Sequence, residues 1–459
     1  MNSFNELCKK LSQDIDTKDT RARARTEQEQ IRFDYAVSYI LRELWNKHFT
    51  HEDNESSIQK NKNFYSALEQ YRDPNLTYRM AIQAFEGLQM LDMIYVTKNG
   101  YYYRNKMEGD LTRFKATHNL RELFNELEGH PAITLKPNLD IQTILLRDRI
   151  DNRNVLVPYD EDKDTEQWRT NLRKINECFS RHILDLRIKD TEIKELQERL
   201  LGDDEKEPID LTKKVLVRIF NNHSFEQGGR FYRAWWQNVP SEYRKHITID
   251  SKKTVEFDFS QLNPNIVYSA HNLELGSEDA YDRVLNGQHR DTVKEAFNAM
   301  LQASTELKQK PKGINLKNLE MGWAELRQAI LDSHKPIQHL FFKGLGNKLQ
   351  FKDSCIAESV MLHYTNLDSP ALPVHDSFVL HHAEGSYGKL EEVMRRAYYD
   401  RFKSDIKVSK EIVVEQVSDV PTDRNGFLSM EVEDILKAEE EYSQWRDRDR
   451  IWLSKLMDK

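Results

Sequence analysis

Apolar residues recur at intervals of three and four positions over much of the N-terminal part of the chain, which is the spacing of amphipathic helices. Within residues 35–49 the apolar positions in this register are Val37, Ile40, Leu41 and Leu44. The same spacing predicts helices over residues 76–91 and 118–133. The first third of the chain is therefore expected to be rich in helix.

Two short runs, Met93–Val96 and Tyr101–Tyr103, have the composition of β-strands. Asn99-Gly100 lies between them and is a strong signal for a tight hairpin turn. A helix followed by a hairpin is typical of the end of a winged-helix unit. Such a unit either contacts DNA or a partner protein, or it is purely structural, and the sequence leaves both alternatives open.

Further along, a helical apolar stripe is formed by Trp168, Leu172, Ile175 and Phe179. Residues 201–210 are polar and predict an exposed linker. After this linker the pattern changes to strands. In residues 254–259, alternation places Val255, Phe257 and Phe259 on one face and Glu256 and Asp258 on the other. The chain then turns into a short helix over residues 265–270. A carboxylate at the end of a strand, just before a helix, is well placed to hold a hard cation.

A second carboxylate, Asp376, lies between two apolar runs at residues 371–374 and 378–381. These runs predict a tight hairpin with His375-Asp376-Ser377 at its turn. A charge between two buried strands needs a partner. A divalent metal ion shared with Asp258 would supply that partner, and a pair of aspartates is suited to holding two Mg²⁺ (or Mn²⁺) ions.

Between the two acids, residues 289–305 predict a helix on which Arg290, Lys294 and Phe297 share one face. Two cations beside an aromatic ring form a clamp for a triphosphate with a base stacked beyond it. The alternative is an ordinary solvated stripe. An acid on a strand, a helix with cations and an acid on a hairpin together suit two-metal nucleotidyl transfer.

The net charge of the chain and its local distribution bear on whether the protein binds nucleic acid. The chain has 459 residues, with 68 Lys and Arg against 76 Asp and Glu, a net charge of −8. This balance predicts weak unaided binding to DNA and suggests a small accessory protein. Residues 213–245, however, carry seven basic and two acidic side chains interleaved with aromatic residues. Such a segment suits phosphates and stacked bases, or it is a buried aromatic cluster with cations at its rim.

Composition excludes other classes of protein. No apolar run approaches the roughly 18 residues that a membrane helix needs, and the first residues lack the apolar core of a signal peptide. The three cysteines share no spacing typical of a zinc site or a disulfide scaffold. A cytoplasmic location is therefore expected. Only 16 glycines and 12 prolines also favour a helix-rich protein.

Five segments, taken in order, resemble motifs of family A DNA polymerases. They are GGRFYRAWWQNVP (228–240) at the primer–template segment, DFSQLNPN (258–265) at motif A, RDTVKEAFNAM (290–300) at motif B, GLGNKLQFKDSCIAESVML (344–362) at a template-contacting helix and PVHDSF (373–378) at motif C. The resemblance covers about residues 210–410. It extends to short polymerase–primases of phages and mobile elements.

The resemblance implies an α+β right-hand polymerase with an antiparallel-sheet palm and helical fingers. It implies catalytic and metal-binding roles for Asp258 and Asp376, with the Phe259 carbonyl as a further metal ligand. The implied nucleotide-binding residues are Gln261, Asn263, Arg290, Lys294 and Phe297. The implied nucleic-acid contacts are Arg230, Gln350 and His375.

Four segments are expected on this basis: a helical, winged-helix-like domain over 1–115, a thumb-like or connecting region over 116–210, the palm and fingers over 211–410, and a strand and helix over 411–459. Asn263 stands where the family has a glutamate that excludes a 2′-hydroxyl, so relaxed choice between dNTP and rNTP is predicted. The template is DNA or RNA, and replication, priming and phage defence stay open. The alternative function is a non-catalytic nucleic-acid-binding factor on a polymerase scaffold.

Overall fold

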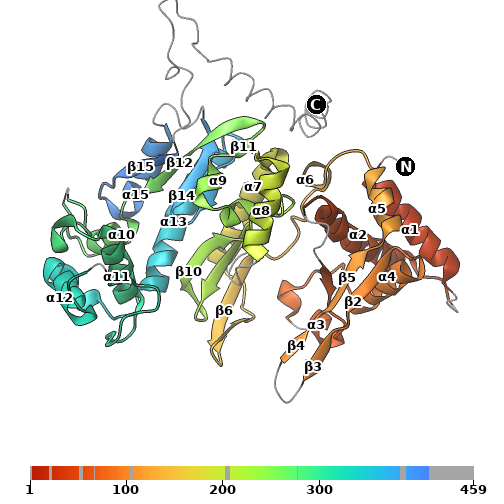
Figure 1. The fold of residues 1–459 in the computed structure, drawn as a ribbon, viewed down its shortest axis with the longest axis horizontal. Helices are drawn as coiled ribbons and strands as arrows, with labels where there is room; N and C mark the ends of the chain where they lie inside the picture. The colour runs from red at the N-terminus through yellow and green to blue at the C-terminus, as the bar shows by residue number, and fades with distance from the viewer. Residues whose placement is uncertain are drawn as a thin grey trace, which may run out of the picture.

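The computed structural model describes residues 3–19, 23–50, 55–66, 68–103, 108–201, 207–276, 278–317, 319–382 and 389–412. It shows a mixed α+β protein with antiparallel sheets and many helices, which confirms the expected α+β class. Figure 1 shows the N-terminal elements as a separate unit beside the remainder of the chain. Within the described residues, no helix combines the length and the apolar composition needed to cross a lipid bilayer.

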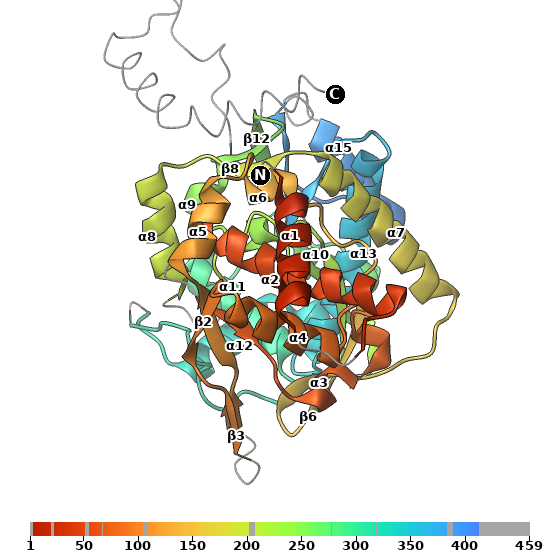
Figure 2. The same cartoon turned by 90° about the vertical axis from the view of Figure 1, so that its right-hand side faces the viewer.

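The N-terminal unit places three main helices beside a three-stranded sheet of order β1-β5-β2 (Figure 2). Its elements are α1 (Phe4–Lys18), α2 (Glu27–Thr50), β1 (Ser56–Ile58), α3 (Lys62–Ser66), η1 (Glu69–Tyr71), α4 (Tyr78–Met90), β2 (Ile94–Lys98), β3 (Tyr101–Tyr103), β4 (Glu108–Asp110), β5 (Thr112–Ala116) and α5 (His118–Asn125). Apolar side chains from α1, α2, α4, β5 and α5 form one core that runs from Phe4 to Leu127.

The expected hairpin at Asn99-Gly100 is wrong in its pairing. Strand β2 pairs with β5, whereas β3 pairs with β4, so one long ribbon continues past these two residues. A Cβ atom on Gly100 would lie 2.6 Å from the backbone nitrogen of Thr112, which places Gly100 inside the ribbon. Residues 104–107, which connect β3 and β4 in the sequence, lie outside the described residues. The ribbon projects from the unit in both views (Figures 1 and 2).

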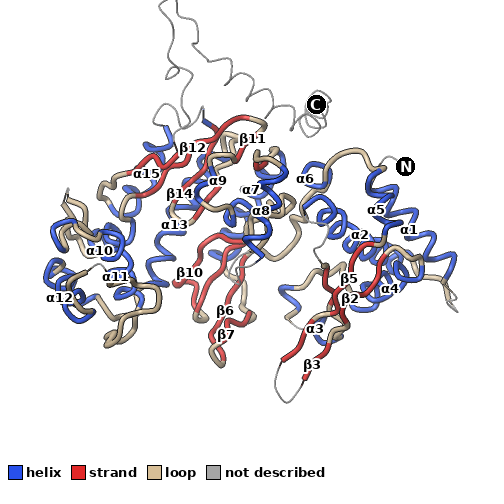
Figure 3. The backbone as a smooth tube through the Cα atoms, in the orientation of Figure 1, coloured by secondary structure: helices blue, strands red, loops and turns tan. Residues whose placement is uncertain are grey.

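The remaining elements surround two further sheets, as Figure 3 shows. They are α6 (Pro131–Thr134), β6 (Ile144–Ile150), β7 (Arg153–Leu156), α7 (Lys163–Arg181), β8 (Leu184–Leu186), α8 (Asp190–Leu201), β9 (Val217–Asn221), β10 (Ser224–Tyr232), η2 (Trp235–Asn238), α9 (Ser241–Arg244), β11 (Ile247–Ile249), β12 (Lys252–Phe259), α10 (Leu262–Ala270), η3 (Leu285–Gly287), α11 (Arg290–Gln302), α12 (Trp323–Ser333), η4 (Lys335–Leu340), α13 (Gly346–Thr365), β13 (Leu372–Val374), β14 (Ser377–His381), α15 (Lys389–Phe402) and β15 (Val408–Ile412).

The sheet that carries the candidate chemistry has the order β13-β14-β12-β11-β8, and β15 also pairs with β12. We call it the central sheet. Its pairings are all antiparallel. The apolar face of β12 is covered because Val255, Phe257 and Phe259 are buried in the larger core. This agrees with the expected alternation along the strand.

A second sheet, β10-β9-β6-β7, joins segments that the sequence assigned to different domains. Strand β6 pairs with β9 in parallel, and the larger core extends from Ala132 to Val408 without a break at residue 210. The two cores thus divide the chain near residue 130, not at 115 and 210. In the expected linker, Ile209 is buried and its backbone exchanges hydrogen bonds with the Gln197 side chain. Beyond β15, the expected C-terminal helix lies outside the described residues.

Most aromatic residues of the basic and aromatic segment at residues 213–245 pack in or against the core. Phe220, Trp235 and Trp236 are fully buried, and Trp236 donates its indole N–H to the carbonyl of Pro373. Arg218 is also fully buried, against Glu358 of α13. The segment therefore fixes the packing of β9 and β10 on α13, and the buried-cluster alternative is the one observed.

Candidate functional site

The two predicted acids lie at the same end of the central sheet. The antiparallel register of β12 and β14 sets Asp258 opposite Ser377, the residue after Asp376. Next to this pair, the backbone N–H of Phe259 points to the carbonyl oxygen of Asp376 at 3.5 Å. The pairing thus brings Asp258, Phe259 and Asp376 together, although 118 residues separate the two acids in the sequence.

A buried polar group supports the same face of the sheet. Glu256 precedes Asp258 by two residues on β12, and its carboxylate accepts the hydroxyl hydrogen of Ser377 at 2.5 Å. Its other oxygen accepts from Nε of Arg244 at 2.9 Å. Glu256 is only 1 % exposed, so this network orders the strand ends without reaching solvent. Ser377 therefore holds the register of the two acidic strands.

Arg230, predicted to contact nucleic acid, reaches α13. It donates to Asp353 at 2.6 and 2.7 Å, and the Asp353 carboxylate is almost completely buried. Burial raises the pKa of Asp353 to about 6, although the charge of Arg230 acts in the opposite direction. Burial alone would lower the pKa of Arg230, but the nearby carboxylates of Asp353 and Asp376 raise it. Arg230 is thus part of the electrostatic environment of Asp376.

The donor set at the strand ends fits a hard cation. Asp258 and Asp376 offer carboxylate oxygens beside the Phe259 backbone, and oxygen is the ligand that Mg²⁺ and Mn²⁺ prefer. Within the described part of the chain, no arginine or lysine lies within ion-pair distance of the Asp376 carboxylate, because Arg230 is bound to Asp353. The charge of Asp376 is therefore available to a cation.

The turn after β12 is ordered by its own side chains. Gln261 has a left-handed backbone (φ 53°), and its side-chain oxygen accepts the backbone N–H of Ala280. Asn263, in the first turn of α10, donates to the side-chain oxygen of Asn298 on α11 at 2.8 Å. These contacts join α10 to α11, so the helix that carries the predicted cations is held against the end of β12.

The three predicted residues of α11 fall in different environments. Arg290 donates to Asp279 at 2.7 and 3.2 Å and lies over the ring of Tyr281, while Lys294 is exposed. Phe297 is fully buried against Tyr281 and Phe341. The predicted stacking of a base on Phe297 is therefore corrected, since the ring belongs to the core face of the helix.

The two other predicted nucleic-acid contacts flank the acids. Gln350 is half-buried on α13, three residues before Asp353 and hence on the same side of the helix. His375 is exposed at the turn between β13 and β14, where its backbone is left-handed (φ 57°). Both positions lie on segments that carry or adjoin the acidic residues.

Sequence reasoning gave no clear role to Asp353 and Glu256. A signal for Asp353 exists, because it occurs at helical spacing among buried positions of α13, with Leu349 before it and Ile356 after it. An acid on an apolar helix face needs a buried partner. For Glu256 the alternation predicted a polar face, but its burial depends on Arg244, which comes from another segment.

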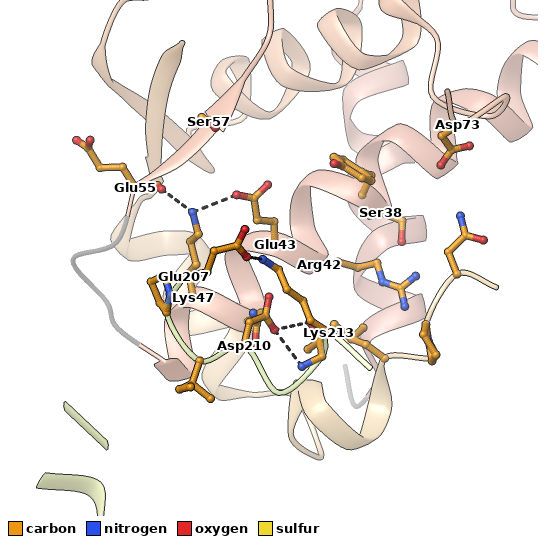
Figure 4. Close-up of a pocket in the computed structure, with 18 of the residues that line it drawn as sticks. Ser38, Arg42, Glu43, Lys47, Glu55, Ser57, Asp73, Glu207, Asp210 and Lys213 are labelled. Atoms are coloured by element: carbon orange, nitrogen blue, oxygen red, sulfur yellow. Dashed lines mark hydrogen bonds and ion pairs between the residues drawn. The ribbon is translucent and has the colours of Figure 1, made fainter. Parts of the chain in front are cut away.

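A cleft with a volume of about 1110 Å³ lies elsewhere, between α2 and residues 207–213 (Figure 4). Its lining contains six cations and six carboxylates: Arg42, Lys47, Arg113, Lys115, Lys136 and Lys213, with Glu43, Glu55, Asp73, Asp110, Glu207 and Asp210. Several are mutually paired, as in Lys213–Glu207 at 2.6 Å and Lys47–Glu43 at 3.1 Å. The cleft includes neither Asp258 nor Asp376, and its balanced charge favours no particular ligand.

Comparisons with known proteins add little to this description. No protein-family model and no curated protein matches the chain. One solved structure, the POL domain of Pol1 from M. smegmatis in complex with DNA primer-template and dNTP, aligns with a TM-score of 0.30 and 14% identity. The alignment covers 48% of this chain and 51% of that chain, so the chain spans about half of that structure. Similarity at this level does not establish a shared fold.

Proposed function

We propose that the protein is a template-directed nucleotidyltransferase with a polymerase core of the family A type. One observation carries this proposal: the pairing of β12 with β14 sets Asp258 opposite Ser377, the residue after Asp376, so both acids lie at the same end of the central sheet. The central sheet corresponds to a palm, and α10, α11 and α12 on one side of it correspond to fingers (Figure 1). A strand and a hairpin that each present one aspartate form a compact oxygen-rich site.

In this proposal Asp258, Asp376 and the Phe259 carbonyl hold Mg²⁺ or Mn²⁺ at the strand ends. When bound, such ions activate the attacking 3′-hydroxyl and stabilise the pyrophosphate leaving group. The protein's own residues keep the two acids in register, through Ser377 and Glu256. They also keep Arg230 engaged with Asp353, so that it does not neutralise Asp376.

Arg290 and Lys294 are the proposed contacts of the nucleotide triphosphate. Arg290 is 40 % exposed, and Asp279 holds its guanidinium at the start of α11. Lys294 lies one turn further along the helix and is exposed. A partly exposed arginine with a fixed geometry suits a phosphate, which it can bind through two parallel hydrogen bonds.

The contacts with the sugar and with the template complete the proposal. Asn263, which is hydrogen-bonded to Asn298, has a neutral side chain that is smaller than the family's glutamate. A smaller side chain leaves room for a 2′-hydroxyl, so we propose that the site accepts both dNTP and rNTP. Gln350 and His375 flank the acids and are proposed to contact the template, which is DNA or RNA. The N-terminal unit, with its projecting ribbon, is the proposed docking module for template or for an accessory protein.

The experiment is incorporation of labelled dNTP or rNTP with Mg²⁺ on primed DNA, on unprimed single-stranded DNA and without template. Asp258→Asn and Asp376→Asn should each reduce incorporation by roughly 10³-fold, about 4 kcal/mol of transition-state stabilisation. Asp332→Asn, which removes an exposed acid on α12, is the matched control and should keep full activity. Activity in the unprimed lane would identify a primase.

Equal incorporation by wild type and both aspartate variants would refute the proposal. Template binding without incorporation under every condition would instead support the alternative, a non-catalytic nucleic-acid-binding factor on this scaffold. Binding is measured separately by fluorescence anisotropy with labelled DNA, because the aspartate variants should retain it.

A further inference from the structure

A second group of metal-ligating side chains lies at the opposite end of the central sheet. Cys178 and His182 are four residues apart at the end of α7, and Asp368 lies in the turn after α13. One donor atom from each of the three residues lies within 4.8 Å of the other two. Residues four apart share one helix face, so Cys178 and His182 point to the same place.

The orientation of His182 selects the atom that faces this group. Its Nδ1 lies 2.6 Å from a carboxylate oxygen of Asp250, whose other oxygen accepts the backbone N–H of Ile183 at 2.8 Å. Because a carboxylate accepts, Nδ1 carries the hydrogen and Nε2 presents its lone pair in the neutral ring. A carboxylate behind a histidine is the usual support of a metal-bound imidazole.

Nε2 of His182 is buried and makes no hydrogen bond to the described residues. It lies 3.6 Å from Oδ1 of Asp368. Two ligands bound about 2.0–2.1 Å from a tetrahedral zinc ion are about 3.3 Å apart, so the observed separation is close to that of a ligand pair. The spacing is too long for a direct hydrogen bond and leaves room for an ion between them.

We propose that Cys178, His182 and Asp368 bind one zinc ion, with water as the fourth ligand. Thiolate, imidazole and carboxylate together favour Zn²⁺ over Mg²⁺. Arg181 donates to Oδ1 of Asp368 at 2.6 and 3.0 Å and orients the carboxylate. The thiolate, Asp368 and Asp250 carry three negative charges, and Zn²⁺ with Arg181 carries three positive charges, so the site is neutral overall.

The ion would link three segments that the chain does not connect locally. These are the end of α7, the turn after α13 and, through Asp250, the turn between β11 and β12. Asp258 lies six positions after Lys252, which is next to this turn, and this corresponds to about 20 Å along the strand. The zinc site is therefore separate from the acidic pair, and its test does not depend on the proposed polymerase activity.

A proton is the competing occupant of this site. Burial lowers the pKa of His182, but the neighbouring side chains of Asp250 and Cys178 raise it to about 10. An imidazolium between two carboxylates would satisfy the same geometry without a metal ion. The two occupants differ in one measurable respect, because only a metal ion forms a bond to the thiolate sulfur of Cys178.

The experiment uses the full chain, purified without chelators from zinc-supplemented medium and dialysed. Elemental analysis should find about one zinc ion per chain in wild type and little in Cys178→Ser or Asp368→Asn. Asp368 is exposed, so its variant should fold even where a change at buried Cys178 does not. Cys8→Ser, at a buried helical cysteine of the other core, is the matched control and should keep the zinc.

Cobalt gives a second readout that reports the ligands directly. Chain loaded with Co²⁺ should show a thiolate-to-cobalt charge-transfer band in the near ultraviolet, absent in Cys178→Ser and present in Cys8→Ser. Equal zinc content in wild type and Asp368→Asn, or cobalt binding without the thiolate band, would overturn the proposal. Wild-type chain free of zinc after this purification would also overturn it and leave the imidazolium as the occupant.

Discussion

Replacing Arg218 with methionine tests how the larger core supports the candidate site. The Arg218 side chain is 1 % exposed and donates to Glu358 at 2.8 Å, to the carbonyl of Gly229 at 2.8 Å and to Ser354 at 3.1 Å. Its guanidinium also lies 4.9 Å from the ring centre of Trp168. The hydrogen bond from Arg218 to Gly229 fixes the position of β10, and the next residue of β10, Arg230, forms the ion pair with Asp353.

The expected cost follows from the group left behind. Methionine keeps most of the side-chain volume, but Glu358 remains buried, and among the described residues only Asn171 still donates a hydrogen bond to it, at 2.8 Å. Removing one partner of a buried ion pair costs about 3–5 kcal/mol. Glu358→Gln alone leaves Arg218 buried without a counter-charge and should cost a similar amount. The double variant loses both charges, so we expect it to be about 2–3 kcal/mol more stable than the sum of the single changes predicts.

Urea unfolding provides the measurement. The two hydrophobic cores are separate, so we expect the transition of the larger core to shift while that of the N-terminal unit stays unchanged. Tryptophan fluorescence reports the larger core through Trp168, which stacks on Phe220 at 5.0 Å. A loss below about 1 kcal/mol in Arg218→Met, or strictly additive single and double variants, would refute the reasoning that this pair stabilises the core.

Three further predictions concern single side chains. Burial lowers the pKa of His334 to about 4, and the neutral ring donates from Nε2 to the carbonyl of Ala280 and accepts from Tyr268 at Nδ1. Because the unfolded chain binds the proton more readily, the free energy of unfolding should fall by up to about 3 kcal/mol as the pH drops from 6.5 to 4. In urea unfolding at several pH values, His334→Gln should lack this loss, whereas His271→Gln at the surface should keep it. Arg290→Ala and Lys294→Ala should each raise the nucleotide KM roughly 10- to 100-fold, as measured by steady-state incorporation, with Lys308→Ala as an exposed control; an unchanged KM would remove α11 from the nucleotide site. Asn263→Glu should shift the ratio of dNTP to rNTP incorporation toward dNTP by at least about 10-fold, and an unchanged ratio would show that residue 263 does not face the sugar.

Local periodicity was sufficient for the elements that carry the acids. The alternation over residues 254–259 and the apolar runs around Asp376 correctly predicted β12 and the hairpin of β13 and β14. Both elements are defined by residues close together in the sequence, and both bury a continuous apolar face. The placement of Asp258 near Asp376, however, rests on pairing between segments 118 positions apart, which periodicity does not show. It was anticipated by the need of Asp376 for a charged partner and by the family resemblance.

Local patterns left burial undecided, or gave it wrongly, where a distant partner determines it. The basic and aromatic composition of residues 213–245 fitted a nucleic-acid surface and a buried cluster equally well. The structure distinguishes the two, because Arg218 and Arg230 of this segment form ion pairs with Glu358 and Asp353 of α13. Phe297 shares a helix face with Arg290, yet Phe341 and Tyr281 enclose it. Helical spacing shows which residues lie on one side, but not which side a neighbouring segment covers.

The pair of Arg230 and Asp353 shows how such a distant contact affects the candidate chemistry. Arg230 is near both Asp353 and Asp376 and could form an ion pair with either of them. A direct ion pair with Asp376 would compete with a metal ion for that carboxylate. Asp353 is buried on α13, where leaving it unpaired would be costly, so it holds Arg230 at 2.6 Å. Arg230 still acts on Asp376 through its charge, without occupying its oxygens. The buried acid Asp353, which looks purely structural, thus keeps the half-buried Asp376 available for a cation.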